Sequence, residues 1–367
     1  MRWDAVDLFA GPGGWEEAAA ALFLRTVGVE WDHSACRTAM AAGHPRVRAD
    51  VASLPLEPFL GIRGLIASPP CPTFSAAGKG SGRHDLPLLL LAIKRLSAGE
   101  WPAEQIAACQ DERTALTLEP LRWALYLQPE WIAWEQVPAV LPVWEACAEV
   151  LREHGYSVAT GSLQAEQYGV PQTRRRAVLV ANRTREVTLP APTHARYVKG
   201  KPRQADGLLP WVSMADALGW GADARPCWTV TSGGTATGGA ETFGNGARQQ
   251  MQKHQEAGAW RVRTSLGTPK DDGRNGSHEL DPHTRPSHTV TTKTQEWRVQ
   301  PPWTHGVKVE PFEAGVLQSF RADYPWQGAV TKRRQQIGNA VPPLLARAVL
   351  EAAGAADHLN RQETATP

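Results

Sequence analysis

Short apolar runs alternate with amphipathic stretches over the first 180 residues, and this alternation limits the possible folds more than any other feature. The apolar runs are Ala5–Phe9, Thr26–Glu30, Leu65–Ala67, Trp131–Trp134 and Ala177–Val180. The stretches between them have helical periodicity, as in Glu16–Leu24, His33–Ala42 and Val143–His154. Repeated β-α-β units of this kind predict an α/β fold with a Rossmann-like, mostly parallel sheet covered by helices on both faces.

The character of the chain changes near Leu189. From there to Gly306 the sequence is rich in Pro, Gly and Thr and shows few helical periods, and the helix-and-strand pattern resumes after Val309. We therefore predict a first domain over 1–188, a smaller, irregular strand-and-loop domain over 189–306, and a return to the first domain over 307–367. Within the second domain Arg225–Thr231 recurs as Arg285–Thr291, which predicts two similar short strands and leaves their pairing open.

Composition excludes several classes of protein. The five cysteines are odd in number, widely spaced and without a Cys-x-x-Cys pair, which argues against a disulfide framework and a structural zinc site and favours a reducing cytosol. No window approaches the roughly 18 uncharged apolar residues of a membrane span, so we expect a soluble protein. The net charge of +2 indicates no partner, but nine Lys or Arg against one acid between Gln172 and Arg203 suit either a phosphate backbone or a solvated surface.

The segment Ser68-Pro69-Pro70-Cys71-Pro72-Thr73 directly follows an apolar strand. Each proline fixes its own φ and biases the preceding residue toward extended geometry, so Cys71 is held at the carboxyl end of the strand, where open parallel sheets carry their chemistry. Taken alone, such a cysteine is more often a small buried apolar residue than a nucleophile. Its neighbours along the sheet edge decide between these two interpretations.

A glycine-rich turn, Asp7 to Trp15, joins the first strand to the first helix and allows a ligand to approach the backbone. Glu30 ends the second strand 19 residues after Gly11, close to the spacing at which an acid meets ribose hydroxyls, and Asp50 ends the third. Trp31 suits either adenine stacking or ordinary packing. The turn matches neither Gly-x-x-x-x-Gly-Lys nor Gly-x-Gly-x-x-Gly, so S-adenosylmethionine fits better than ATP or NAD.

Two further strand ends carry polar side chains. Glu135 closes the strand that starts at Trp131, and period-two alternation before Ala177 sends Arg174 and Arg176 to one face, where they can orient that carboxylate or bind an anionic or carbonyl-bearing substrate. A last glycine turn, Gln336 to Pro343, leads into a C-terminal helix.

Together these residues resemble the DNA (cytosine-5) methyltransferases, in family order and over nearly the whole chain. The matching segments are Asp7–Trp15, Glu30–Trp31, Asp50, Ser68–Ser75, Glu135–Val137, Gln172–Arg176, Glu313–Phe320 and Gln336–Pro343. The resemblance implies Cys71 as the nucleophile, Glu135 as the acid on the cytosine edge, and Arg174 and Arg176 beside a flipped base. It implies cofactor contacts from Phe9, Gly11, Gly13, Gly14, Glu30, Trp31, Asp50, Pro70, Asn339 and Val341, DNA contacts from Ser75, Lys79 and Arg83, and a target-recognition role for 189–306.

The implied reaction is methylation of carbon 5 of a cytosine in double-stranded DNA, with S-adenosylmethionine and no metal. We expect a cytoplasmic, nucleoid-associated monomer that serves restriction-modification or a phage, and the sequence does not identify the recognised bases. The chain departs from the family pattern at three places. Gln136 stands where Asn is usual, Pro72 follows the nucleophile where Gln is often found, and the loop Gly78–Asp85 lacks the usual Arg-Gly ending. Three alternatives stay open: a transfer RNA methyltransferase of the same family, a catalytically silent DNA-binding homologue, and an NAD enzyme.

Overall fold

The computed structural model describes residues 3–70, 81–198, 201, 203, 207–218, 261–263, 279–280, 286–288, 298–300 and 307–357. Its largest feature is a seven-stranded sheet with the strand order β3-β2-β1-β4-β5-β8-β6. The strands are β1 (Ala5–Leu8), β2 (Thr26–Glu30), β3 (Arg46–Arg48), β4 (Gly64–Ala67), β5 (Trp131–Gln136), β6 (Ser157–Gln164) and β8 (Arg175–Asn182). Every residue of β1, β2, β4 and β5 is buried, which explains their nearly continuous apolar sequences.

Five neighbouring strands, from β3 to β5, pair in parallel, whereas β8 pairs antiparallel with both β5 and β6. The mostly parallel sheet is therefore confirmed, but the expected β-α-β repeat does not extend to the last two strands. Only residues 165–174 separate β6 from β8, too few for the crossover of a dozen or more residues that a parallel pair requires. As a result, the first residues of β8 lie at the same sheet edge as the last residues of β5.

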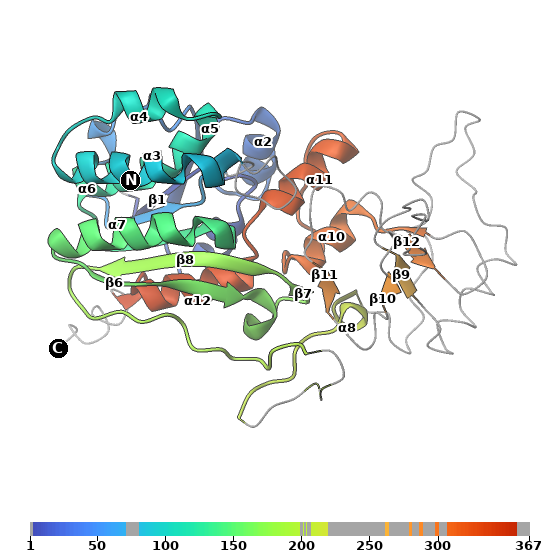
Figure 1. Cartoon of the computed structure of the whole chain (residues 1–367). Coiled ribbons are helices and arrows are strands. Elements are labelled where there is room, and N and C mark those ends of the chain that lie inside the picture. The colour runs from blue at the N-terminus through green and yellow to red at the C-terminus, as the bar shows by residue number, and fades with distance from the viewer. Residues whose placement is uncertain are drawn as a thin grey trace, which may run out of the picture.

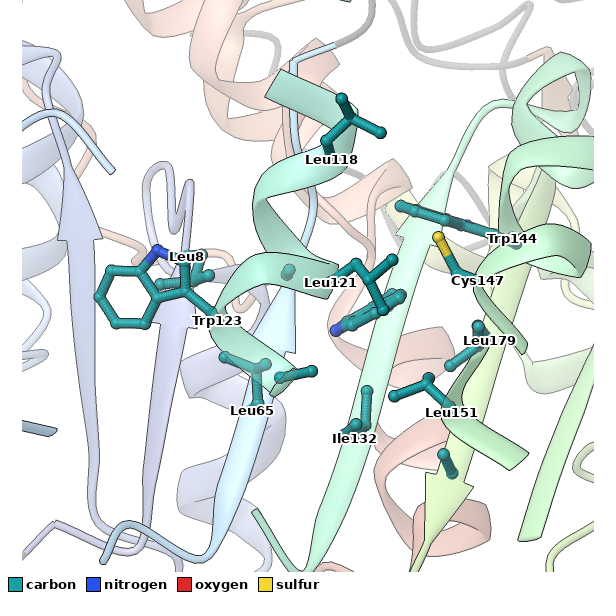
Figure 2. Packing of buried hydrophobic residues seen from close by; sticks show 14 of the residues in the cluster. Leu8, Leu65, Leu118, Leu121, Trp123, Ile132, Trp144, Cys147, Leu151 and Leu179 are labelled. Atoms are coloured by element: carbon teal, nitrogen blue, oxygen red, sulfur yellow. The ribbon is translucent and has the colours of Figure 1, made fainter. Parts of the chain in front are cut away.

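One face of the sheet is covered by α3 (Ser81–Ser97), α6 (Glu119–Leu127) and α7 (Leu141–Glu153), which lie above β6 and β8 in Figure 1. Their apolar side chains form one buried cluster with those of β1, β4 and β5. Figure 2 shows Leu121 and Trp123 of α6 in this cluster with Leu65 of β4 and Ile132 of β5. The short helices α4 (Ala103–Ala108) and α5 (Glu112–Ala115) lie near α3 (Figure 1).

The opposite face is covered by α1 (Gly14–Ala21) and α12 (Pro343–Ala353), which confirms the predicted helices on both faces. Along β5, Ile132 and Trp134 belong to the first cluster, whereas Trp131 and Ala133 belong to the second. This is the period of two expected for a strand buried on both sides. Helix α12 lies below β6 and β8 in Figure 1, so the C-terminal part of the chain packs on the sheet that the N-terminal strands begin.

Helix α3 was not predicted, and its first residues, Ser81 to Asp85, fall within the segment interpreted from the sequence as a glycine-rich loop. They form the first turn of a helix whose buried residues Leu89, Ala92, Ile93 and Leu96 follow the spacing i, i+3, i+4 and i+7. Burial of this apolar face extends the helix toward its N-terminus and through Pro87.

Helices α2 (His33–Ala41), α10 (Pro311–Leu317) and α11 (Val330–Asn339) connect the C-terminal segment to the carboxyl edge of the sheet. The Thr38 hydroxyl of α2 donates to Oε1 of Gln336 at 2.6 Å and accepts from the backbone N–H of Gln327 at 2.8 Å. These buried bonds fix α11 against α2. The turn after α11 is thereby placed beside the end of β1.

Strands also form in the part of the chain predicted to be irregular. The strands β9 (Arg261–Arg263), β10 (Glu279–Leu280), β12 (Arg298–Gln300) and β13 (Val307–Lys308) make an antiparallel sheet of four strands, away from the large sheet in Figure 1. The short β11 (Ser287–His288) pairs in parallel with β7 (Gln172–Thr173). Arg225–Thr231 lies outside the described residues, so its predicted strand is untested, as are the domain boundaries.

The remaining short elements are α8 (Met214–Leu218) and the 3-10 helices η1 (Glu57–Phe59), η2 (Leu116–Leu118), η3 (Pro138–Val140) and η4 (Ala165–Tyr168). Within the described ranges, none of the helices has the length and apolar character needed to cross a membrane. The same part of the chain shows no group of three or more His, Cys, Asp or Glu side chains arranged to hold a metal ion.

Candidate active site

The glycine turn after β1 is held by the acid at the end of β2. The backbone N–H of Gly11 donates to Oε2 of Glu30 at 2.9 Å, and the N–H of Asp32 donates to Oε1 at 2.7 Å. Gly11 and Gly13 have φ values of +58° and +115°, which a glycine adopts without steric cost. Phe9, with a φ of +60°, adopts the same region despite its side chain, so the turn has a strained start.

The C-terminal turn lies against this glycine turn. A Cβ atom on Gly14 would lie 2.1 Å from the carbonyl oxygen of Val341, so only glycine permits this approach. The hydroxyl of Tyr324 donates to the carbonyl of Pro12 at 2.5 Å and adds a second link. The predicted cofactor residues Gly14 and Val341 are thus brought together, and Asn339 is exposed at the end of α11 beside them.

Beyond the turn, the ends of β2 and β3 present an aromatic ring and two acids. The Trp31 side chain is 76% exposed, which favours a ligand-stacking role over the packing alternative. Burial raises the pKa of Glu30, and its hydrogen bonds from backbone N–H groups oppose that shift. A carboxylate has about four lone-pair sites, so Glu30 keeps acceptor capacity for hydroxyl groups after its two described bonds. Asp50 is exposed two residues after β3.

Side chains from two neighbouring elements form hydrogen bonds to the segment that leads to the predicted nucleophile. Nε1 of Trp15, next to the glycine turn, donates to Oγ of Ser68 at 2.9 Å. Nε2 of Gln136 donates to the carbonyl of Pro69, and Oε1 of the same amide accepts from the N–H of Val137. Gln136 therefore connects the end of β5 to the residues that follow β4.

Several predicted residues fall in the gap that follows. The described residues after β4 end at Pro70, which is exposed. Cys71, Pro72, Ser75 and Lys79 lie outside the described residues, and for Arg83 only the backbone within α3 is described.

Glu135 and Arg176 form an ion pair at the same edge, with Nε of the arginine 2.7 Å from Oε1 of the acid. Their side chains are only 6% and 13% exposed, respectively. Antiparallel pairing of β5 with β8 makes this contact possible, because it sets the start of β8 beside the end of β5. Burial lowers the pKa of Arg176, and the charge of Glu135 opposes that shift. The expected proximity of Arg176 to Glu135 is thus confirmed.

Arg174 has different contacts from those expected. It is buried and Arg176 is partly buried, while Arg175 between them is exposed, in agreement with the predicted alternation. However, its guanidinium donates to the carbonyls of Gly338 at 3.3 Å and Ala340 at 3.2 Å, the two residues that flank Asn339. Arg174 therefore supports the C-terminal turn of the cofactor side, and a direct role beside the base stays a prediction.

The basic stretch between Gln172 and Arg203 is not a continuous free surface. Arg174 is buried, Arg176 is paired with Glu135, and Arg183 donates to the carbonyl and side chain of Gln128. Arg185 donates to the carbonyls of Glu351 and Ala352 near the end of α12, and Arg203 pairs with Asp216. The fold itself uses five of the nine positive charges, which weakens the interpretation of this stretch as a phosphate-binding surface.

The described cysteines outside the site do not suit a nucleophile. Cys36 and Cys147 are buried and Cys109 is partly buried. Burial raises the pKa of the Cys36 thiol to about 11 and raises those of Cys109 and Cys147 as well. A thiol with a raised pKa contains less thiolate, the reactive form.

Sequence reasoning missed the polar residues beneath the glycine turn. Glu16 of α1 and Arg46 of β3 are buried as an ion pair, and Arg46 reaches the carbonyl of Gly11. One signal was present in the sequence: Gly28 lies in the middle of the apolar run of β2. A glycine inside a strand often marks the close approach of another group.

A buried acid beside the backbone of Arg174 gives a test of stability against pH. Glu166 of η4 is 2% exposed, and burial raises its pKa from the ordinary value of 4.5 to about 6. A raised folded-state pKa disfavours the charged form, so the stabilisation present below pH 4.5 is lost as the pH rises through 6, at a cost of about 2 kcal/mol. Glu166→Gln should therefore increase the unfolding free energy at pH 8 by up to about 2 kcal/mol and have little effect at pH 4.5.

Denaturant unfolding of both proteins at the two pH values measures this difference. Glu149→Gln, at an exposed position of α7, is the control and should change stability by less than about 0.5 kcal/mol at either pH. An equal effect of Glu166→Gln at both pH values would contradict the assignment.

A family sequence model and individual relatives both match most of this chain. The sequence model of the family described as C-5 cytosine-specific DNA methylase matches residues 3–96 and 103–355. The type II methyltransferase M1.HphI of Haemophilus parahaemolyticus is 25% identical over 96% of this chain and 87% of its own length. The type II methyltransferase M.NaeI of Lentzea aerocolonigenes is 26% identical over 94% of this chain and 73% of its own.

Solved structures share the fold. A putative DNA modification methyltransferase encoded within a prophage of E. coli superposes with a TM-score of 0.58 at 19% identity, over 97% of this chain and 99% of the other. The Dnmt2 methyltransferase of S. pombe superposes with a TM-score of 0.57 at 14% identity, over 98% of this chain and 100% of the other.

Proposed function

Because the chain belongs to the C-5 cytosine-specific DNA methylase family and is a DNA (cytosine-5) methyltransferase, we propose that its reaction proceeds through a covalent adduct of Cys71 with a flipped cytosine. The methyl group comes from S-adenosylmethionine. The base is extruded because carbon 5 and carbon 6 are inaccessible within a stacked duplex.

The observation that carries this proposal is the arrangement around Glu135. The acid is paired with Arg176, and the next residue, Gln136, holds the carbonyl of Pro69, two residues before Cys71. A carboxyl group and the described residues that lead to Cys71 are thus fixed to the same strand end. Addition of a nucleophile to cytosine requires both, because an acid must act on the base while the thiolate attacks it.

In the proposed reaction the Cys71 thiolate forms a bond to carbon 6, and the electrons of the 5,6 double bond shift so that carbon 5 becomes nucleophilic. Glu135, held by Arg176, contacts the ring nitrogen and the amino group and stabilises the charge that develops there. Carbon 5 takes up the methyl group as the bond between the methyl carbon and the sulfonium sulfur breaks, and the sulfur keeps that electron pair and leaves as the thioether S-adenosylhomocysteine. A base, such as water, then removes the proton of carbon 5, the double bond re-forms, and the thiolate leaves.

The residues at the ends of β1, β2 and β3 fit an adenosine-bearing cofactor. The exposed Trp31 ring offers a stacking surface, the Glu30 carboxylate accepts from hydroxyls, and the glycine turn lets a ligand approach the backbone. Bound S-adenosylmethionine supplies an electrophilic methyl group on a sulfonium. We propose contacts from Phe9, Gly11, Gly13, Gly14, Glu30, Trp31, Asp50, Pro70, Asn339 and Val341.

The proposal extends to the DNA. We propose residues 189–306 as the target-recognition domain and 1–188 with 307–367 as the catalytic domain, and we assign DNA contacts to Ser75, Lys79 and Arg83. The similarity to type II methyltransferases supports a role in restriction-modification in the cytoplasm. We propose that the protein acts as a monomer.

Base-resolution sequencing of 5-methylcytosine tests this function. The full chain is expressed in a bacterial host without cytosine methylation, and we expect 5-methylcytosine at one recurring DNA sequence. Purified protein is then offered a duplex with that sequence and transfer RNA, each with S-adenosylmethionine. Methylation of transfer RNA alone would replace the DNA assignment by the RNA alternative, and binding of DNA without methylation of either substrate would support a silent homologue.

A further inference from the structure

Three residues form a row across neighbouring strands beneath the glycine turn. Asp7 of β1 pairs with Gly28 of β2, and Gly28 pairs with Arg46 of β3. Asp7 lies two residues after Ala5 of the second cluster, so it points to the face that α1 covers. Because Gly28 carries no side chain, the Arg46 side chain has a path across β2 toward β1 and α1.

The space above Gly28 is filled by an ion pair. Nη1 of Arg46 lies 2.5 Å from Oε1 of Glu16, and the two side chains are 1% and 0% exposed. A Cβ atom on Gly28 would lie 2.3 Å from this nitrogen and 2.6 Å from this oxygen. Any larger residue at position 28 therefore has to displace the pair.

The charge of Arg46 has a buried counter-charge. Burial together with the neighbouring Glu16 carboxylate raises the pKa of the fully buried Asp7 well above the usual range. The charge of Arg46 is compensated by the carboxylate of Glu16, with which it forms the ion pair. Such compensation matters because an unpaired buried charge destabilises a fold by several kcal/mol.

The guanidinium also reaches the glycine turn. Nη2 of Arg46 donates to the carbonyl of Gly11 at 3.2 Å, while the N–H of Gly11 donates to Glu30. Gly11 is thus held on both of its backbone polar groups. A glycine has the widest conformational freedom of any residue, so a glycine-rich sequence does not by itself restrict the turn to one conformation. The two hydrogen bonds of Gly11 hold the turn in the observed conformation.

We propose that Arg46 is a positioning residue for cofactor binding: it crosses β2 above Gly28 and fixes the Gly11 carbonyl, so that the turn is ordered before the ligand arrives. The proposal rests on the proposed function, because it assigns the glycine turn to S-adenosylmethionine. It adds Glu16 as the balancing charge and Gly28 as the residue that leaves the space.

Calorimetric titration of the full chain with S-adenosylhomocysteine tests the proposal. Arg46→Gln removes the donor to Gly11, and Gly28→Ala displaces the guanidinium while leaving every charge in the chain. Each is expected to raise the dissociation constant about 10- to 100-fold, the range for loss of a hydrogen bond from a charged group. The KM for S-adenosylmethionine should rise by the same factor, with kcat at saturating cofactor and the KM for DNA within about twofold of wild type.

Arg25→Gln is the matched control, because it removes an exposed arginine-carboxylate pair with Asp4 at the other end of β2 and should leave the dissociation constant unchanged. The double variant Gly28→Ala/Arg46→Gln should bind no more than about twofold more weakly than Arg46→Gln, because both changes act on one contact. If Arg46→Gln does not fold, the dissociation constant of Gly28→Ala alone tests the proposal.

Two outcomes separate the two proposals. Wild-type affinity in Gly28→Ala and Arg46→Gln, or a fall in kcat with an unchanged dissociation constant, would overturn the positioning role. A wild-type protein that does not bind S-adenosylhomocysteine would instead overturn the cofactor assignment of the proposed function.

Discussion

Replacement of Cys71 by alanine is expected to abolish methyl transfer, with a loss of at least about 10³-fold, because the enamine that attacks the methyl donor cannot form without the sulfur. DNA binding should persist, since the remaining contacts of the protein with the duplex do not involve the thiol. The measurement is transfer of a radioactive methyl group to a duplex with the recognised sequence, together with a binding titration of the same duplex.

Cys109→Ala is the matched control, because this thiol is partly buried, donates to the carbonyl of Gln105 in α4, and has a pKa that burial raises. It should retain wild-type activity. A duplex with 5-fluorocytosine at the target should trap the wild-type protein, since fluorine cannot leave carbon 5 as a proton does, and the mass increase should map to the peptide with Cys71. Substantial turnover by Cys71→Ala would contradict the covalent mechanism.

Glu135→Gln is expected to lower kcat by roughly 10²- to 10³-fold, the usual effect of removing one group that stabilises developing charge. An amide can contact the cytosine edge, but it cannot act as an acid toward the base and it carries no negative charge to balance that of Arg176. The substitution also leaves the buried Arg176 without its partner, which should lower the unfolding free energy by roughly 3 kcal/mol.

These two effects can be separated. The double variant Glu135→Gln/Arg176→Gln removes both charges and should recover much of the stability lost in Glu135→Gln, because an uncharged pair avoids the isolated buried cation. Its activity should stay as low as that of the single variant. Single-turnover kinetics and denaturant unfolding measure the two quantities, and recovery of activity along with stability would show that Glu135 acts only through the fold.

Much of this molecule was predictable from local sequence. Apolar runs that are buried on both faces read as strands, so β1, β2, β4 and β5 were found, and amphipathic periods identified α1, α2 and α7. The helix α3 was not predicted. Its first residues belong to the segment Gly78 to Asp85, which has the composition of a loop, and burial of Leu89 and Ile93 overrides that local preference. The acid at a strand end and the arginine before a strand were also visible, since strand ends meet at one edge.

The cluster under the glycine turn was not predictable in the same way. Glu16, Gly28 and Arg46 lie on three different elements, and no spacing along the chain connects them. The function of Arg174 was equally hidden, because its partners Gly338 and Ala340 are more than 160 residues away in sequence and are backbone carbonyls, which any residue type provides.

The sequence by itself therefore determined the fold class and the family, and it predicted that Arg174 and Arg176 both lie near Glu135, because periodicity acts between residues that are close along the chain. Only the tertiary structure decided how the charges are distributed. In the structure Arg176 pairs with Glu135, Arg174 donates to the C-terminal turn, and Arg46 donates to Gly11 from beneath the glycine turn. Further arginines contact other parts of the fold: Arg183, Arg185 and Arg203. The physical reason is that a charge finds its partner through space and burial, whereas a strand or helix forms from the pattern of its own residues.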